Sequence, residues 1–136
     1  MLTREQILAM PDADYMGPVQ LEFFKSLLKD QLLATDQALQ GARESLANVE
    51  RPSDPVDAAY IEEQRYRLMA DIKRNSEARK DILTAIQRVS ENDYGWCEES
   101  GEEIGLMRLL ANPTARKSIH AQENSEMRGR HLLKSA

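Results

Sequence analysis

The sequence predicts an all-α protein built mostly on one long antiparallel coiled-coil hairpin. Two segments of roughly thirty residues carry apolar residues at steps of three and four, which is the spacing of one stripe along a helix. A short break, residues 51–59, separates the two segments. Helices with matching stripes and a short connection most simply fold back and bury their stripes against each other. We therefore expect the break to form the tip of the hairpin.

The composition suits a hairpin better than a globular core. Of 136 residues, 41% are hydrophobic and 5% aromatic, while 30% are charged. The net charge of -5 and the pI near 5.1 argue against a generic nucleic-acid binder, which would carry a basic surplus. We expect a protein partner with basic surfaces and no direct sequence-specific contact with nucleic acid.

Cysteine usage and the N-terminus bear on the compartment. Cys97 is the only cysteine, so the sequence offers no intrachain disulfide and no cysteine-built metal site. The N-terminus lacks a basic stretch followed by an apolar one, and no apolar run is long enough to cross a bilayer. These features predict a soluble, cytoplasmic protein with no membrane contact.

The N-terminal segment, residues 1–18, is expected to pack on the globular lobe. Residues 3–6 read as the cap of a short helix that Pro11 stops, and a loop follows to Pro18. The first long helix is predicted from about Pro18 to Val49. Its apolar or small stripe consists of Leu21, Phe24, Leu28, Leu32, Thr35, Leu39, Ala42, Leu46 and Val49.

The break before the second helix holds the most informative local chemistry. Asp54, Pro55 and Asp57 match an N-cap, a first-turn proline and an acidic third position. Capping explains both carboxylates, because they accept backbone N–H bonds and face the positive end of the helix dipole. The functional alternative is that the tip presents acidic groups to something basic or metal-bearing in a partner's cleft. The two interpretations are compatible if a capping aspartate keeps one oxygen exposed.

The second long helix is predicted from Val56 to about Ser90. Its stripe consists of Ile61, Leu68, Ile72, Ile82, Ile86 and Val89. Three polar residues interrupt this stripe. We interpret Asn75 as a device that fixes the pairing register. Arg65 and Arg79 either extend outward to solvent or pair with acidic residues of the first helix.

After residue 92 the helical spacing of apolar residues ends. Three glycines and clustered aromatic residues within residues 94–105 indicate turns and a small hairpin. A short helix over Leu106–Ala111 and a terminal helix from Ser118 onward complete the chain. The residues expected to hold this lobe by packing are Trp96, Ile104, Leu106, Leu109, Leu110 and Ile119.

Catalytic arrangements are scarce in this sequence. Nothing in the spacing of the two histidines, His120 and His131, places either beside Cys97 as a base, and phosphate-binding glycine motifs are absent. Residues 97–100 and 118–121 have the spacing of zinc knuckles, but only Cys97 supplies a thiolate. We therefore interpret Cys97 as a small buried apolar residue. A weak zinc site made by Cys97, His120 and a carboxylate is the alternative.

Taken together, the motifs resemble a known family. They are D-P-V-D-A-A at residues 54–59, D-Y-G-W-C at 93–97, G-E-E-I-G at 101–105 and R-L-L-A-N-P-T-A-R at 108–116. From about Leu21 to its end, the chain resembles the DksA/TraR family of bacterial RNA polymerase regulators. The resemblance implies a coiled-coil hairpin over residues 19–91 and a zinc-finger-like lobe with a C-terminal helix over residues 92–136.

The same resemblance implies a mechanism. Such proteins insert through the secondary channel of the polymerase and alter the lifetime of promoter complexes, commonly together with ppGpp in the stringent response. The functional tip of the family is matched here by Asp54, Asp57 and Ala59, which would act by contact and not as catalysts. The implied partner is RNA polymerase, and the protein is expected to be a monomer.

Two departures from the family pattern stand out. The four zinc-ligand positions fall on Cys97, Ser100, Ser118 and Ala121, so three of them cannot act as thiolates. The chain therefore resembles a cysteine-poor, zinc-independent member of the kind that replaces a zinc-containing paralogue when zinc is short. Non-basic residues (Asp81, Asn112 and Gln122) stand where ppGpp-responsive members tend to be basic. We expect no required cofactor and no direct ppGpp binding, with ppGpp retained as a co-regulator.

Two alternatives stay open at this level. A coiled-coil adaptor or scaffold would have the same fold without a polymerase role, although the polar residues in the second stripe favour a single intramolecular pairing. A factor that stimulates transcript cleavage would use the tip aspartates to help hold a magnesium ion. The capping role expected for Asp54 disfavours that second alternative. The leading hypothesis is a non-enzymatic transcription regulator.

Overall fold

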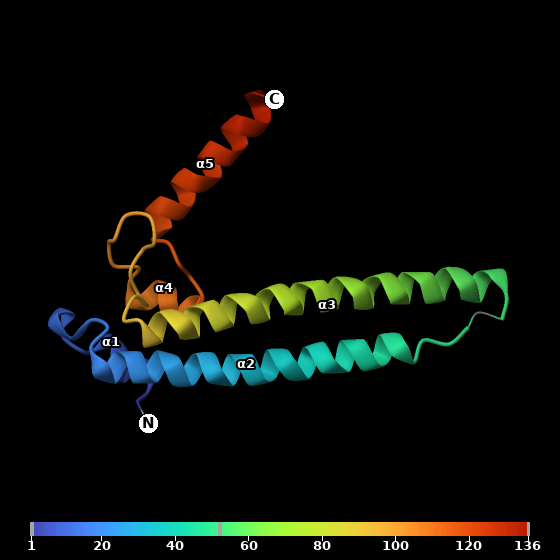
Figure 1. The fold of residues 1–136 in the computed structure, drawn as a ribbon, viewed down its shortest axis with the longest axis horizontal. Helices are drawn as coiled ribbons and strands as arrows, with labels where there is room; N and C mark the ends of the chain where they lie inside the picture. Colours follow the sequence, from blue (N-terminus) through green and yellow to red (C-terminus); the bar gives the residue numbers. More distant parts are fainter. Residues whose placement is uncertain (1, 52, 136) are drawn as a thin grey trace. The chain divides into compact units, whose positions relative to one another are not determined.

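The computed structural model describes residues 2–51 and 53–135, and the side chains as far as residue 132 (Figure 1). Met1, Pro52 and Ala136, which fall in the predicted N-terminal segment, tip and terminal helix, lie outside the described residues. The elements in chain order are α1 (Arg4–Leu8), the 3-10 helix η1 (Asp12–Asp14), α2 (Pro18–Ala47), α3 (Pro55–Ser90), α4 (Leu106–Ala111) and α5 (Ile119–Ser135). The predicted all-α class is confirmed, and the small hairpin expected after residue 92 is reduced to one isolated bridge between Trp96 and Glu103.

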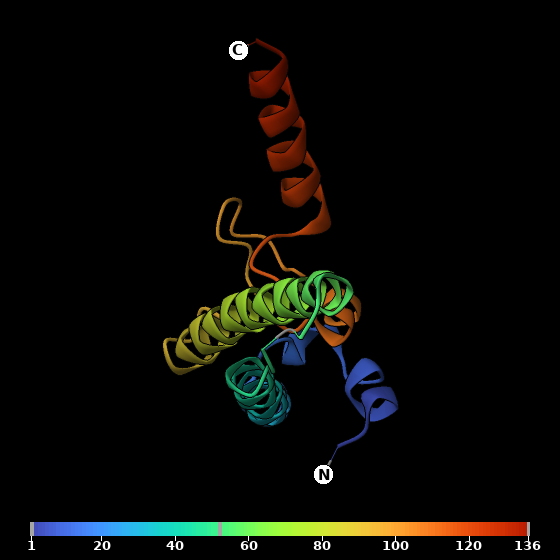
Figure 2. The same ribbon diagram turned by 90° about the vertical axis from the view of Figure 1, so that its right-hand side faces the viewer.

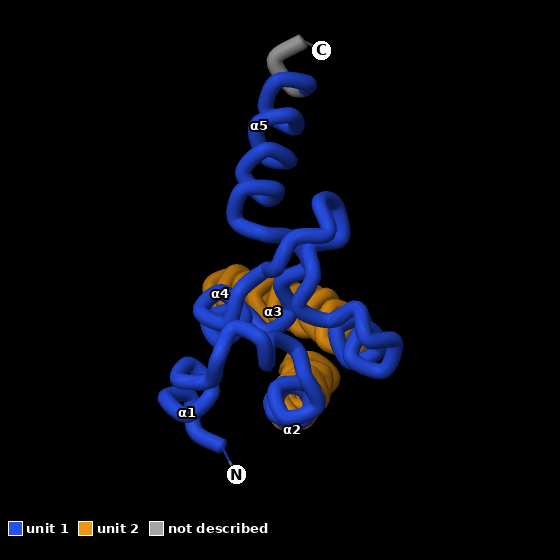
Figure 3. The backbone as a smooth tube through the Cα atoms, turned by 90° about the vertical axis from the view of Figure 1, so that its left-hand side faces the viewer, with its two compact units in different colours: residues 1–28, 84–136 blue, residues 29–83 orange. Residues whose placement is uncertain are grey.

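The chain divides into two compact units (Figure 3). Unit 1 comprises residues 1–28 and 84–136, and unit 2 comprises residues 29–83. Each long helix contributes to both, because α2 leaves unit 1 after Leu28 and α3 re-enters it at Thr84. No helix in the described part of the chain is long and apolar enough to cross a membrane.

Unit 2 is the antiparallel part of the hairpin, in which α2 and α3 run side by side (Figures 1 and 2). The predicted bounds are close: α2 ends at Ala47 instead of Val49, and α3 begins at Pro55 instead of Val56. Two helices alone bury little apolar surface. The most buried apolar side chains of unit 2 are those of Ile82 and Leu39. The other stripe residues of unit 2 are half-buried, for example Leu32, Ile61 and Leu68.

The polar residues in the second stripe behave differently from one another. Arg79 pairs across the hairpin, with its Nε donating to Oδ1 of Asp36 at 2.6 Å. Of the two alternatives for Arg79, pairing with the first helix is therefore the one observed. Asn75 instead donates its amide N–H to the Asp71 carbonyl of its own helix at 2.9 Å. Its proposed role in register is not carried by this bond.

Unit 1 is organised around a small core to which the N-terminal segment contributes. The cap expected over residues 3–6 is present as a capping box between Thr3 and Gln6. The core side chains with the least exposure are Tyr94, Phe24, Ile7, Leu28, Leu109 and Gln20. The ring centroids of Phe24 and Tyr94 lie 5.5 Å apart, so α2 and the segment after α3 share one cluster.

Hydrogen bonds join the N-terminal segment to the rest of unit 1. Arg4 donates to the Leu110 carbonyl at 2.7 Å, which satisfies an end group of α4. The Tyr15 hydroxyl donates to the Gly95 carbonyl at 2.6 Å and accepts from the Gly105 N–H at 2.9 Å. One side chain thus ties together both ends of the 95–105 loop.

The packing prediction for the lobe is wrong at two positions. Ile104, Leu109 and Leu110 are buried and Leu106 is half-buried, but Trp96 is 36% exposed and Ile119 is 57% exposed. Ile119 is the first residue of α5, where the helix has only just begun and its side chain lies outside the core. Trp96 meets Tyr15 edge-on, with ring centroids 5.3 Å apart and planes at 88°, and this contact leaves much of the indole open.

Candidate functional site

The tip of the hairpin is built by the start of α3. Asp54 caps the helix, because its Oδ1 accepts the Asp57 N–H at 2.8 Å. Its carbonyl accepts the Ala58 N–H at 2.9 Å, and Pro55 is the first helical residue. The capping interpretation of Asp54 is therefore confirmed by geometry.

Asp57 has a second contact that sequence reasoning missed. The Ser53 hydroxyl donates to Oδ2 of Asp57 at 2.6 Å. The signal was a hydroxyl residue directly before the N-cap and four positions before an aspartate, a spacing that brings both side chains to the same turn. Ser53 restrains the Asp57 side chain without covering it, since Asp57 stays exposed.

The three predicted tip residues are brought together on the first two turns of α3. Asp54, Asp57 and Ala59 are all exposed. Val56, which lies between the two aspartates, is 80% exposed, and Tyr60 beside Ala59 is 68% exposed. The tip therefore offers carboxylate acceptors next to apolar surface, a combination that suits contact with a protein.

The tip does not form a metal site by itself. Among the described residues, no three His, Cys, Asp or Glu side chains come close enough to hold a metal ion. One oxygen of Asp54 is used in capping, and one oxygen of Asp57 is used by Ser53. The arrangement can accept hydrogen bonds from a partner's basic groups.

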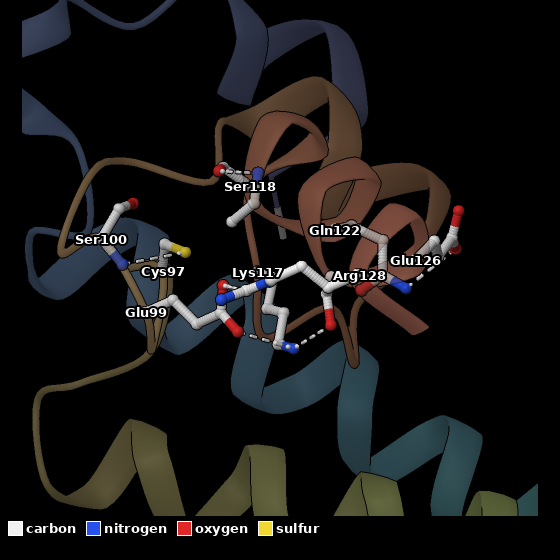
Figure 4. A network of polar contacts seen from close by, with 10 residues as sticks. Cys97, Glu99, Ser100, Lys117, Ser118, Gln122, Glu126 and Arg128 are labelled. Atoms are coloured by element: carbon white, nitrogen blue, oxygen red, sulfur yellow. Dashed lines mark hydrogen bonds and ion pairs between the residues drawn. The ribbon is translucent and has the colours of Figure 1, made fainter. Parts of the chain in front are cut away.

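The four residues predicted to stand at zinc-ligand positions lie in unit 1, on the loop after residue 96 and around the start of α5. Figure 4 labels three of them, Cys97, Ser100 and Ser118. Cys97, Ser118 and Ala121 are buried, and Ser100 is exposed. The Ser100 N–H donates to the Cys97 sulfur at 3.5 Å. The Ser118 hydroxyl accepts the Ala121 N–H at 3.2 Å and so caps α5.

These four residues do not fit a zinc ion. Ala121 has no ligand atom, and the hydroxyl of Ser118 is used by the helix it caps. His120, the candidate substitute ligand, is exposed and its Nε2 lies 3.3 Å from the Asn124 amide nitrogen on the same helix. The alternative of a weak site made by Cys97, His120 and a carboxylate finds no such group among the described residues.

Cys97 has an unusual electrostatic environment for a packing residue. Burial raises the pKa of its thiol, but hydrogen bonds to the sulfur lower the pKa by more than burial raises it, and the resulting pKa is about 6. The donors are the Ser100 hydroxyl and the backbone N–H groups of Ser100, Ser118 and Glu99. Cys97 is buried as expected, with 3% exposure, yet it serves as a hydrogen-bond acceptor as well as a packing group.

Two of the three positions compared with ppGpp-responsive members form local hydrogen bonds. Asn112 accepts the Thr114 hydroxyl at 3.0 Å, and Gln122 donates to Glu126 at 3.0 Å. Asp81 lies exposed on α3 in unit 2. None of the three brings a positive charge for a phosphate group.

Comparison with known proteins gives consistent likenesses. A family profile described as the prokaryotic dksA/traR C4-type zinc finger matches residues 92–126. The chain is 37% identical over 123 residues to the RNA polymerase-binding transcription factor DksA of Caulobacter vibrioides, covering 88% of this chain and 84% of the relative. It is 32% identical over 126 residues to DksA of Escherichia coli K12, covering 90% and 82%. The solved structure of transcription factor DksA2 from Pseudomonas aeruginosa matches with a TM-score of 0.85 and 42% identity, over 95% of this chain and 100% of that one.

Proposed function

This chain belongs to the DksA/TraR family, and we propose that it regulates transcription by placing its acidic hairpin tip in the secondary channel of bacterial RNA polymerase. As a DksA-like transcription factor it binds the polymerase and is not an enzyme. Its site of action is accordingly the bacterial cytoplasm. The tip alters the stability of promoter complexes by contact.

The observation that carries this proposal is that the two tip aspartates have different roles: one caps α3 and the other stays available to a partner. Asp54 caps α3 and so fixes the first turn of the helix. Asp57, held by Ser53, keeps a carboxylate oxygen exposed beside Ala59. A restrained, exposed carboxylate forms stronger hydrogen bonds to a partner's Lys, Arg or N–H groups than a neutral acceptor would. Pre-ordering by the cap lowers the entropy lost on binding.

We also propose that this protein acts when zinc is scarce, in place of a zinc-containing paralogue. The support is chemical: only one of the four family ligand positions carries a thiolate, and the lobe is folded around hydrogen bonds at those positions. Joint action with ppGpp in the stringent response would then run through the polymerase. The non-basic residues at positions 81, 112 and 122 support this route, because they offer no positive charge to bind ppGpp directly.

The test is the lifetime of promoter complexes measured with purified polymerase. Asp57→Asn keeps the size of the side chain and removes its charge, so it should lose most of the effect while keeping most of the affinity. Asp30→Asn makes the same change at an exposed position on α2 away from the tip, and should behave as wild type. Asp54→Ser retains a capping oxygen and should lose less activity than Asp54→Ala.

Two results would count against the proposal. Full activity of Asp57→Asn would show that the tip carboxylate is not the acting group. Failure of the wild-type protein to capture polymerase subunits from a bacterial lysate would favour the adaptor alternative. Stimulated transcript cleavage in stalled complexes would instead revive the magnesium-holding role.

A further inference from the structure

The lobe of this protein keeps the arrangement of a zinc-binding lobe without the ligands to hold zinc. An open cleft of about 840 Å³ lies between the 99–102 loop and α5, and residues of both segments line it. In a metal-bound lobe of this type, a shared ion would join the two pairs of ligand positions. Here some other interaction must oppose the separation of the loop from α5.

Glu99 occupies the position to do this (Figure 4). Its Oε1 lies 3.1 Å from the Lys117 ammonium, and its Oε2 lies 3.4 Å from a guanidinium nitrogen of Arg128. Lys117 precedes α5 and also donates to the Ser125 hydroxyl at 3.2 Å. One carboxylate thus spans from the loop to both the connection before α5 and the third turn of the helix.

We propose that Glu99, with Lys117 and Arg128, is an ionic clamp that joins the loop to α5 in place of the metal ion. The clamp residues flank the former ligand positions, since Glu99 lies between Cys97 and Ser100 and Lys117 directly precedes Ser118. A charged group at this site supplies by ion pairing part of the cross-link that zinc supplies by coordination.

The environment makes the pair between Glu99 and Lys117 more effective than a typical surface pair. Exposed pairs contribute little because water and salt screen them. The Lys117 side chain is only 22% exposed and that of Glu99 36%, and the three charges form a network. The outer pair with Arg128 is weaker, because the Arg128 side chain is 68% exposed.

Hydrogen exchange of α5 amides in chelator-containing buffer tests the clamp. Glu99→Gln should raise the exchange rates of residues 119–132 roughly fivefold, corresponding to one broken partly buried pair. Glu98→Gln is the matched control, since Glu98 is exposed on the same loop and no ion pair of its side chain is among those found in the described residues. Amides of unit 2 should not change and serve as the internal reference. Salt near 1 M, which shortens the screening length to about 3 Å, should reproduce much of the Glu99→Gln effect in the wild type.

A second variant set separates the clamp from a general loss of stability. Glu99→Gln and Lys117→Met should be non-additive, because either change breaks the same pair. In a variant that restores the family ligands through Ser100→Cys, Ser118→Cys and Ala121→Cys, added zinc should make Glu99→Gln silent. Equal exchange in the Glu99→Gln and Glu98→Gln variants would overturn the proposal. Additive effects, or an undiminished Glu99→Gln effect in the zinc-loaded variant, would overturn it equally.

Discussion

Gly95→Ala tests how closely the N-terminal segment is packed against the lobe. Gly95 has φ of 91°, a conformation that costs an L-residue energy, and its backbone is buried. A Cβ at this position would lie 2.4 Å from Cγ and 2.8 Å from Sδ of Met16. Met16 is itself 8% exposed and has a positive φ of 52°, so it has little room to move.

The expected cost has two parts that a matched variant separates. Backbone strain contributes about 1–3 kcal/mol, and overpacking a closed site contributes another 1–3 kcal/mol. Gly101→Ala carries the strain without the clash, because φ is 73° and no atom beyond the adjacent residues lies within 4 Å of the added Cβ. We therefore expect Gly95→Ala to destabilise the protein by about 1–3 kcal/mol more than Gly101→Ala.

Urea unfolding followed by circular dichroism measures both costs, and a double-mutant cycle with Met16→Ala isolates the clash. Met16→Ala removes the atoms that the new Cβ would meet, so the double variant should be more stable than the sum of the two single changes predicts. Equal costs for Gly95→Ala and Gly101→Ala would contradict a clash between the added Cβ and Met16. Strict additivity in the cycle would refute it as well, because the Met16 side chain would then not be the obstacle.

Two further predictions concern polar groups in the core of unit 1. Tyr94→Phe removes the donor to the Pro113 carbonyl, a hydrogen bond of 2.7 Å between buried groups, and should lower the free energy of urea unfolding by about 1–3 kcal/mol. The control, Tyr60→Phe at a 68% exposed position, should lower it by less than about 0.5 kcal/mol. Similar costs at both sites would contradict the role of the Tyr94 hydrogen bond. Because the pKa of Cys97 is about 6 in the fold against 9.0 ordinarily, the stability due to its thiolate is fully present above pH 9 and is lost as the pH falls toward 6. The slope of unfolding free energy against pH should reach about 1.4 kcal/mol per unit at most and should flatten in Cys97→Ser, whereas unchanged slopes would show that the thiol stays protonated.

Local rules were sufficient for the long helices and their caps. The three-and-four spacing of apolar residues, Pro18 and the Asp54-Pro55 pair set the helix bounds to within two residues, because each acts through backbone geometry near in sequence. The same rules gave the capping role of Asp54. The Ser53 contact to Asp57 belongs to this local class too, because the two residues are only four positions apart.

The lobe was harder to predict because its order comes from contacts distant in sequence. The Tyr15 hydroxyl, which joins Gly95 and Gly105, lies 80 and 90 residues from its partners. The sequence predicts that Trp96 helps to hold the lobe by packing, but Phe24 and Tyr94 fill the aromatic positions of the core, and Trp96 lies at its edge against Tyr15. The presence of a single cysteine in the sequence shows that zinc ligands are missing. It could not show which residues join the loop to α5, since Glu99, Lys117 and Arg128 are ordinary surface charges in the sequence.

The most direct test of the central claim is the lifetime of a promoter complex measured with Asp57→Asn, in the presence of a zinc chelator and with and without ppGpp. We expect the wild-type protein to alter the lifetime despite the chelator, and Asp57→Asn to bind polymerase but leave the lifetime nearly unchanged. An Asp57→Asn variant as active as the wild type would contradict the claim that the tip carboxylate acts on the polymerase. Loss of wild-type activity on chelation would contradict the claim that the lobe works without zinc.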